Sequence, residues 1–172
     1  ADGRITVNMG VPSFVPADAS FDADGLATQH QAADTQYLLP LTDHVVEISC
    51  VSMGNPHAVQ IVRDTALHPV ASEGPAIERH PLFTKRVNAG FMQVHDTHHV
   101  NLRVYERGAG ETLACGTGAC AAAVAGIRRG VLQSPVEVAM RGGDLQIVWA
   151  GEGQPVFLSG PAVAVFEGEI DI

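Results

Sequence analysis

The sequence is poor in lysine and in positive charge. Its 172 residues include 10 lysines and arginines against 19 acidic residues, the net charge is −9, and Lys85 is the one lysine. A single lysine disfavours an enzyme that works through a lysine Schiff base. Because the sequence has no basic stripe, nucleic acid and anionic membrane surfaces are poor partners for it.

Cysteine, long apolar runs and targeting signals are also scarce. Three cysteines do not make a disulfide framework, so we expect a reducing, cytoplasmic location. The longest uncharged apolar stretch, Ala119–Ile127, is too short to span a bilayer. The first residues show neither an initiator methionine nor a signal-peptide pattern, which is typical of a processed chain or a piece of a longer one.

Hydrophobic alternation predicts a chain built mainly of strands. Hydrophobic residues make up 46% of the sequence, which favours a packed core over disorder. Ile5, Val7 and Met9 alternate with polar residues and predict a half-buried strand. Further strands are expected at Val45–Val51, His57–Val62, Arg86–His95, His99–Glu106, Val136–Met140, Leu145–Trp149, Val156–Ser159 and Ala162–Gly168.

Two other local patterns give turns and a short helix. Pro75 suits the first position of a helix over Ala76–His80, which Pro81 would end. Arg141-Gly142-Gly143-Asp144 is a strong hairpin signal. No clear periodicity runs through Phe14–Asp34.

One longer helix is predicted at Gly118–Arg129, closed by Gly130. Its residues are apolar on every side, and such a helix in a soluble protein should be enclosed. We therefore expect an α+β fold in which a mixed or antiparallel sheet curls around a central buried helix.

The residue with the most chemical interest is Cys115, at the entrance to this helix. Unpaired amide N–H groups and the positive end of the helix dipole there favour a thiolate. Gly116 and Gly118 allow close approach, so the same amides could hold a substrate carboxylate. This geometry points to an acid/base cysteine that works on an amino acid. The alternative is that Cys115 is a small packing residue at a tight helix entrance.

Glu106 favours the catalytic interpretation. It continues the apolar row of Val100, Leu102 and Val104, so a carboxylate is expected to point inward at the end of a strand. Cys50 and Cys120 lie in apolar rows and are predicted to be core residues. No metal site is expected, because His95 and His98 fall on opposite strand faces and no acidic or cysteine cluster completes a ligand set.

Several blocks of the sequence resemble diaminopimelate epimerases, in the order in which that family has them. The resemblance covers essentially the whole chain. The blocks are Val51-Ser52-Met53-Gly54-Asn55-Pro56-His57, Val87-Asn88-Ala89-Gly90-Phe91, Arg103-Val104-Tyr105-Glu106-Arg107-Gly108, Ala114-Cys115-Gly116-Thr117-Gly118, Gly160-Pro161-Ala162 and Val165-Phe166-Glu167-Gly168.

The resemblance implies an isomerase of lysine and cell-wall precursor biosynthesis that converts LL- to meso-diaminopimelate without pyridoxal phosphate or metal. In that family two similar domains each wrap a sheet around a helix, and one cysteine from each domain faces the substrate α-carbon. Cys115 resembles the cysteine of the second domain. Glu106 resembles a carboxylate that contacts the substrate ammonium, and His57 a histidine that assists the opposite cysteine.

The same resemblance assigns the binding residues. The amides of Gly116 and Thr117 are similar to those that hold the reacting carboxylate. Asn55, Asn88 and Arg107 look like the set that recognises the distal end of the substrate, where an arginine suits a carboxylate.

The family's first half, with its own Cys-Gly-Asn-Gly block, has no counterpart here. The expected division is residues 1–15 and 161–172 belonging with an absent domain, and residues 16–160 forming the carboxyl-terminal epimerase domain. Inversion needs a base on one face of the α-carbon and an acid on the other, so this chain alone is predicted to be inactive. The expected partner is the small-molecule substrate, and a homodimer is left open.

Two alternatives remain. A proline or hydroxyproline racemase-like enzyme shares the two-thiol logic, although Arg107 with Asn55 and Asn88 suits a distal group that a cyclic amino acid lacks. A non-catalytic amino-acid-binding domain would leave Cys115 merely packed. The alkylation rate of Cys115 against those of Cys50 and Cys120 separates that interpretation from the catalytic one.

Overall fold

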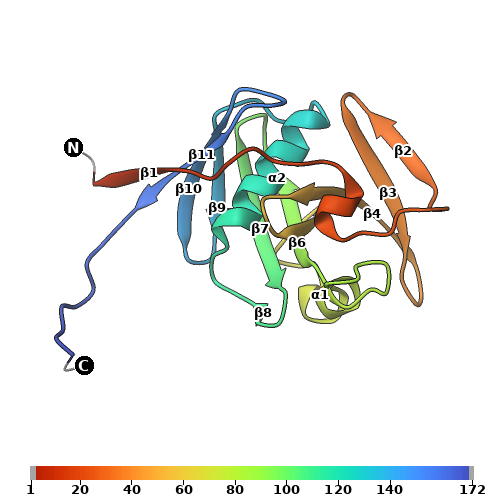
Figure 1. The fold of residues 1–172 in the computed structure, drawn as a ribbon, viewed down its shortest axis with the longest axis horizontal. Coiled ribbons are helices and arrows are strands. Elements are labelled where there is room, and N and C mark those ends of the chain that lie inside the picture. The colour runs from red at the N-terminus through yellow and green to blue at the C-terminus, as the bar shows by residue number, and fades with distance from the viewer. Residues whose placement is uncertain (1–2, 171–172) are drawn as a thin grey trace.

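The computed structural model describes residues 3–170 as one mixed sheet with α-helices on both of its faces (Figure 1). Residues 1–2 and 171–172, which the predicted terminal segments include, lie outside the described residues. The elements are β1 (Arg4–Asn8), η1 (Pro16–Ala19), β2 (Thr28–Gln31), β3 (Asp34–Pro40), β4 (Val45–Ser52), β5 (Pro56–Ile61), α1 (Val70–Glu78), β6 (Asn88–Val94), β7 (His99–Glu106), β8 (Gly110–Glu111), α2 (Gly116–Arg128), β9 (Val136–Met140), β10 (Gly143–Trp149) and β11 (Val156–Pro161).

The sheet runs in the order β1-β11-β10-β9-β7-β6-β5-β4-β3-β2, with β8 paired to β7. Most neighbours are antiparallel, but β5 pairs with β6 and β7 pairs with β9 in parallel. Parallel neighbours need a crossover connection. Helix α1 lies in the connection from β5 to β6, and α2 lies in the connection from β7 to β9. The predicted α+β class is confirmed at this level.

Helix α2 is buried over its central nine residues, as its all-apolar sequence predicted. Every residue from Gly118 to Gly126 is buried, and α2 contacts β4, β5, β6, β7, β9, β10 and β11. Small side chains permit this close packing. A side chain at Gly126 would collide with Leu132, so glycine is required there. Gly130 follows the helix with φ +73, as a residue after a helix end commonly does.

The central strands are covered on both faces. Val59 and Met92 belong to the core around α2, whereas their neighbours Ala58 and Phe91 belong to a second core that includes Val70 and Ile77 of α1. Adjacent strand residues point to opposite faces, so β5 and β6 lie between the two helices. Cys50 lies in the second core and Cys120 in the first, as predicted for core residues.

Some expectations for individual elements are wrong. Helix α1 begins at Val70, not at Ala76, and Pro75 lies inside it. The burial of Val70 and Ile77 on one side of α1 outweighs the backbone hydrogen bond that proline cannot donate. The stretch without periodicity, Phe14–Asp34, contains η1 and β2 and leads into β3. Their polar, largely exposed residues give no burial pattern to detect.

The two ends of the described chain also differ from expectation. Strand β1 pairs with β11 but is exposed throughout, with 56% of Ile5 and 45% of Val7 accessible, so it is not half-buried. Residues 162–170 form no strand and are all exposed, and they extend away from the sheet (Figure 1). Alternation predicts which residues share a face, but burial of that face also requires a covering layer.

Two further expectations concern the hairpin at Arg141-Gly142-Gly143-Asp144 and the lack of a membrane-spanning segment. Met140 pairs with Gly143, so β9 and β10 form the predicted hairpin, and its loop is Arg141-Gly142. Within residues 3–170, no helix is long and apolar enough to cross a membrane.

Candidate functional site

The sheet topology brings the predicted site residues to one end of the molecule. Strands β5 and β6 are parallel and start at Pro56 and Asn88, so Asn55 and Asn88 lie at the same edge. Strand β7 is antiparallel to β6, and therefore its last residue, Glu106, reaches that edge too. Helix α2 begins a few residues later, at Cys115.

Hydrogen bonds connect the start of β5 to the start of α2. The Asn55 Nδ2 donates to Thr117 Oγ1 at 3.2 Å, and the Asn55 Oδ1 lies 3.0 Å from His57 Nε2. The Cys115 Sγ lies 3.7 Å from the same Thr117 hydroxyl. Residues far apart in the sequence thus form one continuous polar chain that ends at the sulfur atom.

Cys115 occupies the position that precedes the first residue of α2. Its backbone is extended (φ −142, ψ 103), and its side chain is 6% exposed. A side-chain carbon on Gly118 would lie 3.1 Å from the Cys115 Sγ and 3.0 Å from Val104, so glycine there leaves the space that the sulfur atom needs. The structure thus places the sulfur just below the surface at the mouth of the helix.

The environment raises the pKa of the Cys115 thiol, which corrects the expected bias toward thiolate. Burial is the largest cause, and the nearby Glu106 carboxylate adds to it by charge and by a hydrogen bond. Hydrogen bonds from Thr117 and from the Gly118 amide act in the opposite direction but are weaker in sum. The helix amides do favour thiolate, as predicted, but desolvation outweighs them. The resting state is therefore the thiol.

Glu106 is half-buried at the end of β7, below the apolar row of Val100, Leu102 and Val104, all of which are buried. The Thr112 hydroxyl donates to Glu106 Oε1 at 2.5 Å. Thr112 was not predicted, although its place between Glu106 and Cys115 in a glycine-rich turn was a usable signal. The carboxylate is held toward the cysteine, where it can accept the thiol proton.

Asn88 and Arg107 lie together beside this cluster. Asn88 is buried, donates through Nδ2 to the Pro56 carbonyl at 3.1 Å and accepts the Arg107 N–H through Oδ1 at 2.9 Å. The Arg107 side chain is exposed, and one Nη1–H donates to the Lys85 carbonyl at 3.1 Å. Most of the guanidinium therefore faces solvent and is free to meet a charged ligand.

His57 is a neutral, buried side chain. It is 1% exposed, and burial together with the charge of Arg107 lowers its pKa to about 3. Strand β5 is paired with β4 and with β6, so His57 lies between two neighbouring strands. An imidazole of such low basicity is suited to hydrogen bonding with Asn55, and it lacks the charge needed to act as an acid near neutral pH.

The amides of Gly116 and Thr117 complete the cluster. The first N–H groups of a helix have no partner within it. The Ala119 N–H already donates to the Cys115 carbonyl at 2.9 Å, so the amides before it are the ones that point out of the helix. A side-chain carbon on Gly116 would lie 3.3 Å from Leu158, so the backbone here runs close to β11. These N–H groups can hold an anion beside the sulfur atom.

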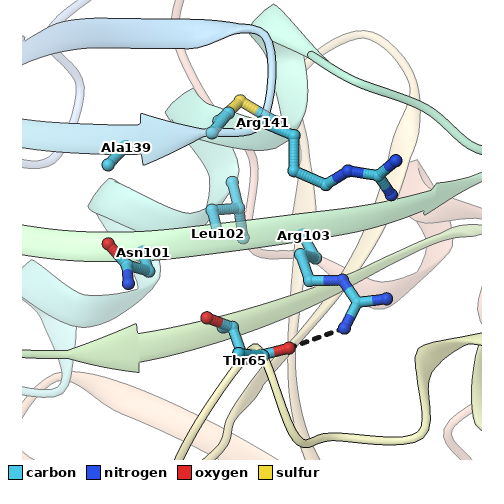
Figure 2. A pocket seen from close by; sticks show the side chains of 8 residues that line it. Thr65, Asn101, Leu102, Arg103, Ala139 and Arg141 are labelled. Atoms are coloured by element: carbon cyan, nitrogen blue, oxygen red, sulfur yellow. Dashed lines mark hydrogen bonds between the residues drawn. The ribbon is translucent and has the colours of Figure 1, made fainter.

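A hollow of about 510 Å³ lies apart from the Cys115 cluster, between β7, β9 and the loop at Thr65. Figure 2 shows Arg103 and Arg141 there, with the Arg103 guanidinium bonded to the Thr65 carbonyl. Both arginines also bind Glu111, which offsets their charge. No residue predicted for the site is among those that line this hollow. Within residues 3–170, no group of three or more acidic, cysteine or histidine side chains is placed to hold a metal ion.

Comparison with known proteins assigns the chain to a family. The family model described as diaminopimelate epimerase matches residues 49–165. Curated diaminopimelate epimerases from Ralstonia pickettii (strain 12J) and Nitrosospira multiformis are 62% and 64% identical over 99% and 100% of this chain. The chain belongs to the diaminopimelate epimerase family. It spans only 59% and 60% of the length of these two relatives.

Solved structures agree on the fold. A hydroxyproline epimerase from Agrobacterium vitis, with bound trans-4-hydroxy-L-proline, matches 92% of this chain and 50% of its own with a TM-score of 0.58 at 15% identity. A probable proline racemase from Agrobacterium radiobacter K84, with bound carbonate, matches 95% of this chain and 54% of its own with a TM-score of 0.56 at 14% identity. At such low identity these likenesses show a shared fold alone.

Proposed function

We propose that this chain is the carboxyl-terminal part of an enzyme that converts LL- to meso-diaminopimelate by two-cysteine acid/base catalysis, and that it supplies one of the two cysteines. One observation carries the proposal above all. The Cys115 sulfur lies at the mouth of a buried helix, between the Glu106 carboxylate and unpaired helix amides. Family membership supports the choice of substrate.

The raised pKa of Cys115 determines how the step must begin. When Cys115 serves as the base, its thiol proton passes to Glu106, and the thiolate then removes the α-proton from the substrate. The carbanion that forms takes a proton from a second thiol on its opposite face, which inverts the centre. In the reverse direction the Cys115 thiol is the proton donor. One proton leaves the substrate and one arrives. At the end Glu106 holds the proton that Cys115 released and the second cysteine is a thiolate, so that proton returns to the second cysteine by exchange through solvent before the next turnover.

The remaining residues bind and orient the substrate. The amides of Gly116 and Thr117 hold the reacting carboxylate and stabilise charge that develops on it. Glu106, besides accepting the thiol proton, contacts the substrate ammonium. Asn55, Asn88 and Arg107 recognise the distal end, with the exposed Arg107 guanidinium available to the second carboxylate.

His57 has an indirect role in this scheme. Its hydrogen bond orients Asn55, and its ring is neutral because its pKa is lowered to about 3. The assistance it gives the opposite cysteine is hydrogen bonding, because a pKa of about 3 leaves it a weak base.

The second cysteine belongs to a segment outside this chain. Cys50 and Cys120 are core residues whose pKa is raised to about 12 by burial, so neither can act as the opposing thiol. Exposed β1 and residues 161–170 offer apolar surface for such a segment to cover. We include in the proposal that residues 16–160 form the domain itself, with its sheet wrapped around α2.

The test compares this chain with a fused protein. The part of the Nitrosospira multiformis relative that this chain does not match is joined ahead of Ala1 to give the fused protein. The fused protein and the 172-residue chain are each incubated with LL-diaminopimelate in deuterated water. We expect the fused protein to invert the α-carbon with deuterium uptake, and the 172-residue chain not to do so. Cys115→Ala in the fused protein should abolish inversion.

Two results would contradict the proposal. Appreciable inversion by the 172-residue chain alone would disprove the shared site, and retained activity in the fused Cys115→Ala protein would disprove the role of that cysteine. Proline is offered to the fused protein as the second substrate. Its racemisation in preference to diaminopimelate would favour the proline racemase-like alternative.

A further inference from the structure

Glu78 is a buried carboxylate that the proposed chemistry does not use. It is the last residue of α1 and is 1% exposed. A negative charge at the carboxyl end of a helix is unfavourable, and a buried charge is costly unless it is paired. Two arginines offset the cost: Arg79 Nε lies 3.2 Å from Oε2, and Arg86 Nη1 lies 3.4 Å from Oε1.

The same carboxylate holds the loop that follows β7. The Gly108 N–H donates to Glu78 Oε1 at 3.1 Å, directly after Arg107. On the other side of Arg107, its own N–H donates to Asn88 Oδ1 at 2.9 Å. The backbone on either side of Arg107 is therefore fixed, one peptide by Glu78 and the next by Asn88.

Glu78 also holds the segment that receives the Arg107 side chain. The Val87 N–H donates to the Glu78 carbonyl at 3.2 Å, and Arg86 adopts a left-handed backbone conformation (φ 59) that is strained for a residue with a side chain. Arg107 Nη1 donates to the carbonyl of Lys85, the next residue toward the amino terminus. Glu78 therefore contacts both segments on which the guanidinium depends: its carboxylate binds the Gly108 N–H and Arg86, and its backbone carbonyl binds the Val87 N–H.

The helix that carries Glu78 has little freedom to shift. A side-chain carbon at Gly74 would lie 2.6 to 2.8 Å from three carbons of Tyr105, so α1 rests directly on the residue before Glu106. Interior packing of this kind transmits small displacements. Movement of α1 would reach Tyr105 directly and, through the bond from the Gly108 N–H to Glu78, the backbone next to Arg107.

We propose that Glu78 is the positioning residue of the distal subsite, which sets how tightly Arg107 can hold the far carboxylate of the substrate. The proposal deepens the proposed function and rests on it for the identity of the ligand. Glu78 itself touches no substrate. It acts on binding, because the proton-transfer groups Cys115 and Glu106 are held by Thr117 and Thr112.

The kinetic test uses the fused protein described above. We expect Glu78→Ala to raise KM for diaminopimelate about tenfold, and Glu78→Gln about threefold, because the amide oxygen still accepts the Gly108 N–H but lacks charge. The value of kcat should stay within about twofold. Glu73→Gln is the matched control: Glu73 is 8% exposed on the same helix but bonds His44, His68 and Gln60 instead.

Each kinetic outcome decides the proposal. An unchanged KM in Glu78→Ala, or a fall in kcat at unchanged KM, would overturn it. An equal rise of KM in Glu73→Gln would show a general loss of helix packing and would also overturn it.

A second measurement does not depend on enzyme activity, so it tests the role of Glu78 even if the proposed function is wrong. Amide hydrogen exchange is followed at Arg107, Gly108 and Thr112 in the 172-residue chain. Glu78→Ala should speed exchange at Gly108 and Arg107 about tenfold relative to Glu73→Gln, with Thr112 unchanged. If the unaltered fused protein is inactive, the proposed function fails, while this result still shows whether Glu78 fixes the loop. Unchanged exchange at Gly108 would refute the positioning role.

Discussion

At the scale of single residues, opposing effects of neighbouring groups decide the state of Cys115. Helix amides and the Thr117 hydroxyl favour thiolate, but burial and the Glu106 carboxylate favour the thiol, and the thiol is preferred. Sequence position identifies the helix entrance, but it does not measure desolvation. A thiol that is protonated at rest can act as donor at once and as base only after it loses a proton.

The three cysteines should react at different rates. Cys115 is expected to be alkylated faster than Cys50 and Cys120 at pH 8 to 9, because burial raises the pKa of the other two thiols to about 12, whereas hydrogen bonds from Thr117 and the Gly118 amide limit the rise at Cys115. Iodoacetamide labelling followed by mass spectrometry of each peptide measures the rates. Equally slow modification at all three positions would favour the interpretation that Cys115 is only a packing residue.

Because Glu106 raises the pKa of Cys115, substitutions around the thiol should change its alkylation rate in a defined direction. Glu106→Gln removes a charge that raises the Cys115 pKa, so alkylation of Cys115 at pH 8 should become faster. Thr117→Val removes a hydrogen bond that lowers the pKa and should make it slower. A slower reaction in Glu106→Gln would contradict the proposed contact between carboxylate and sulfur.

At the scale of elements, the two helices cover opposite faces of the central strands and fix the ends at which the site residues lie. The alternation of Ala58 with Val59 and of Phe91 with Met92 between two cores shows this directly. Helix α1 extends further than its sequence suggests, because buried contacts at Val70 and Gly74 stabilise the turn before Pro75.

Substitution of Gly74 tests how closely α1 is docked. Gly74→Ala is expected to destabilise the chain by about 1–3 kcal/mol, since the new carbon would collide with the Cβ and ring of Tyr105. Ser72→Ala, at an exposed position of the same helix, is the control and should change stability little. Urea unfolding measures both. Higher stability in Gly74→Ala, from its better helix propensity, would show that α1 can move away from β7.

At the scale of the whole molecule, a buried ionic cluster joins the end of α2 to the β3–β4 hairpin. Asp34 is 4% exposed and accepts hydrogen bonds from Ser49 at 2.5 Å and Gln36 at 2.8 Å. The Arg129 Nε lies 3.4 Å from Asp34 Oδ2, and its Nη2 donates to Glu47. This cluster anchors the helix at the end opposite Cys115.

Removal of Arg129 should leave the buried Asp34 carboxylate with the longer contact to Arg128 Nε at 3.9 Å. Arg129→Ala is expected to lower the free energy of unfolding by about 3–5 kcal/mol, whereas loss of the half-exposed Arg141 should cost under about 1 kcal/mol. Urea titration of the two variants gives the comparison. Nearly equal stabilities would mean that water reaches Asp34 and that the cluster is not a true interior pair.

Much of the site could be predicted from sequence because its residues cluster in short blocks. Asn55 and His57, Glu106 and Arg107, and Cys115 to Thr117 are each contiguous or nearly so, and the helix entrance at Cys115 follows from the apolar run after it. The residues that hold these blocks in position could not be predicted in this way. Thr112 and Glu78 act through contacts whose partners are known only once the strands pair.

By itself, the sequence determined the apolar helix α2, the alternating strands, the core positions of Cys50 and Cys120, and the membership of a family. These depend on local pattern and composition, which a linear chain carries in full. Only the tertiary structure decided that β1 is exposed, that His57 is buried between two strands and that Cys115 rests as a thiol. Burial is a property of what packs around a residue, and neighbours distant in the sequence provide it.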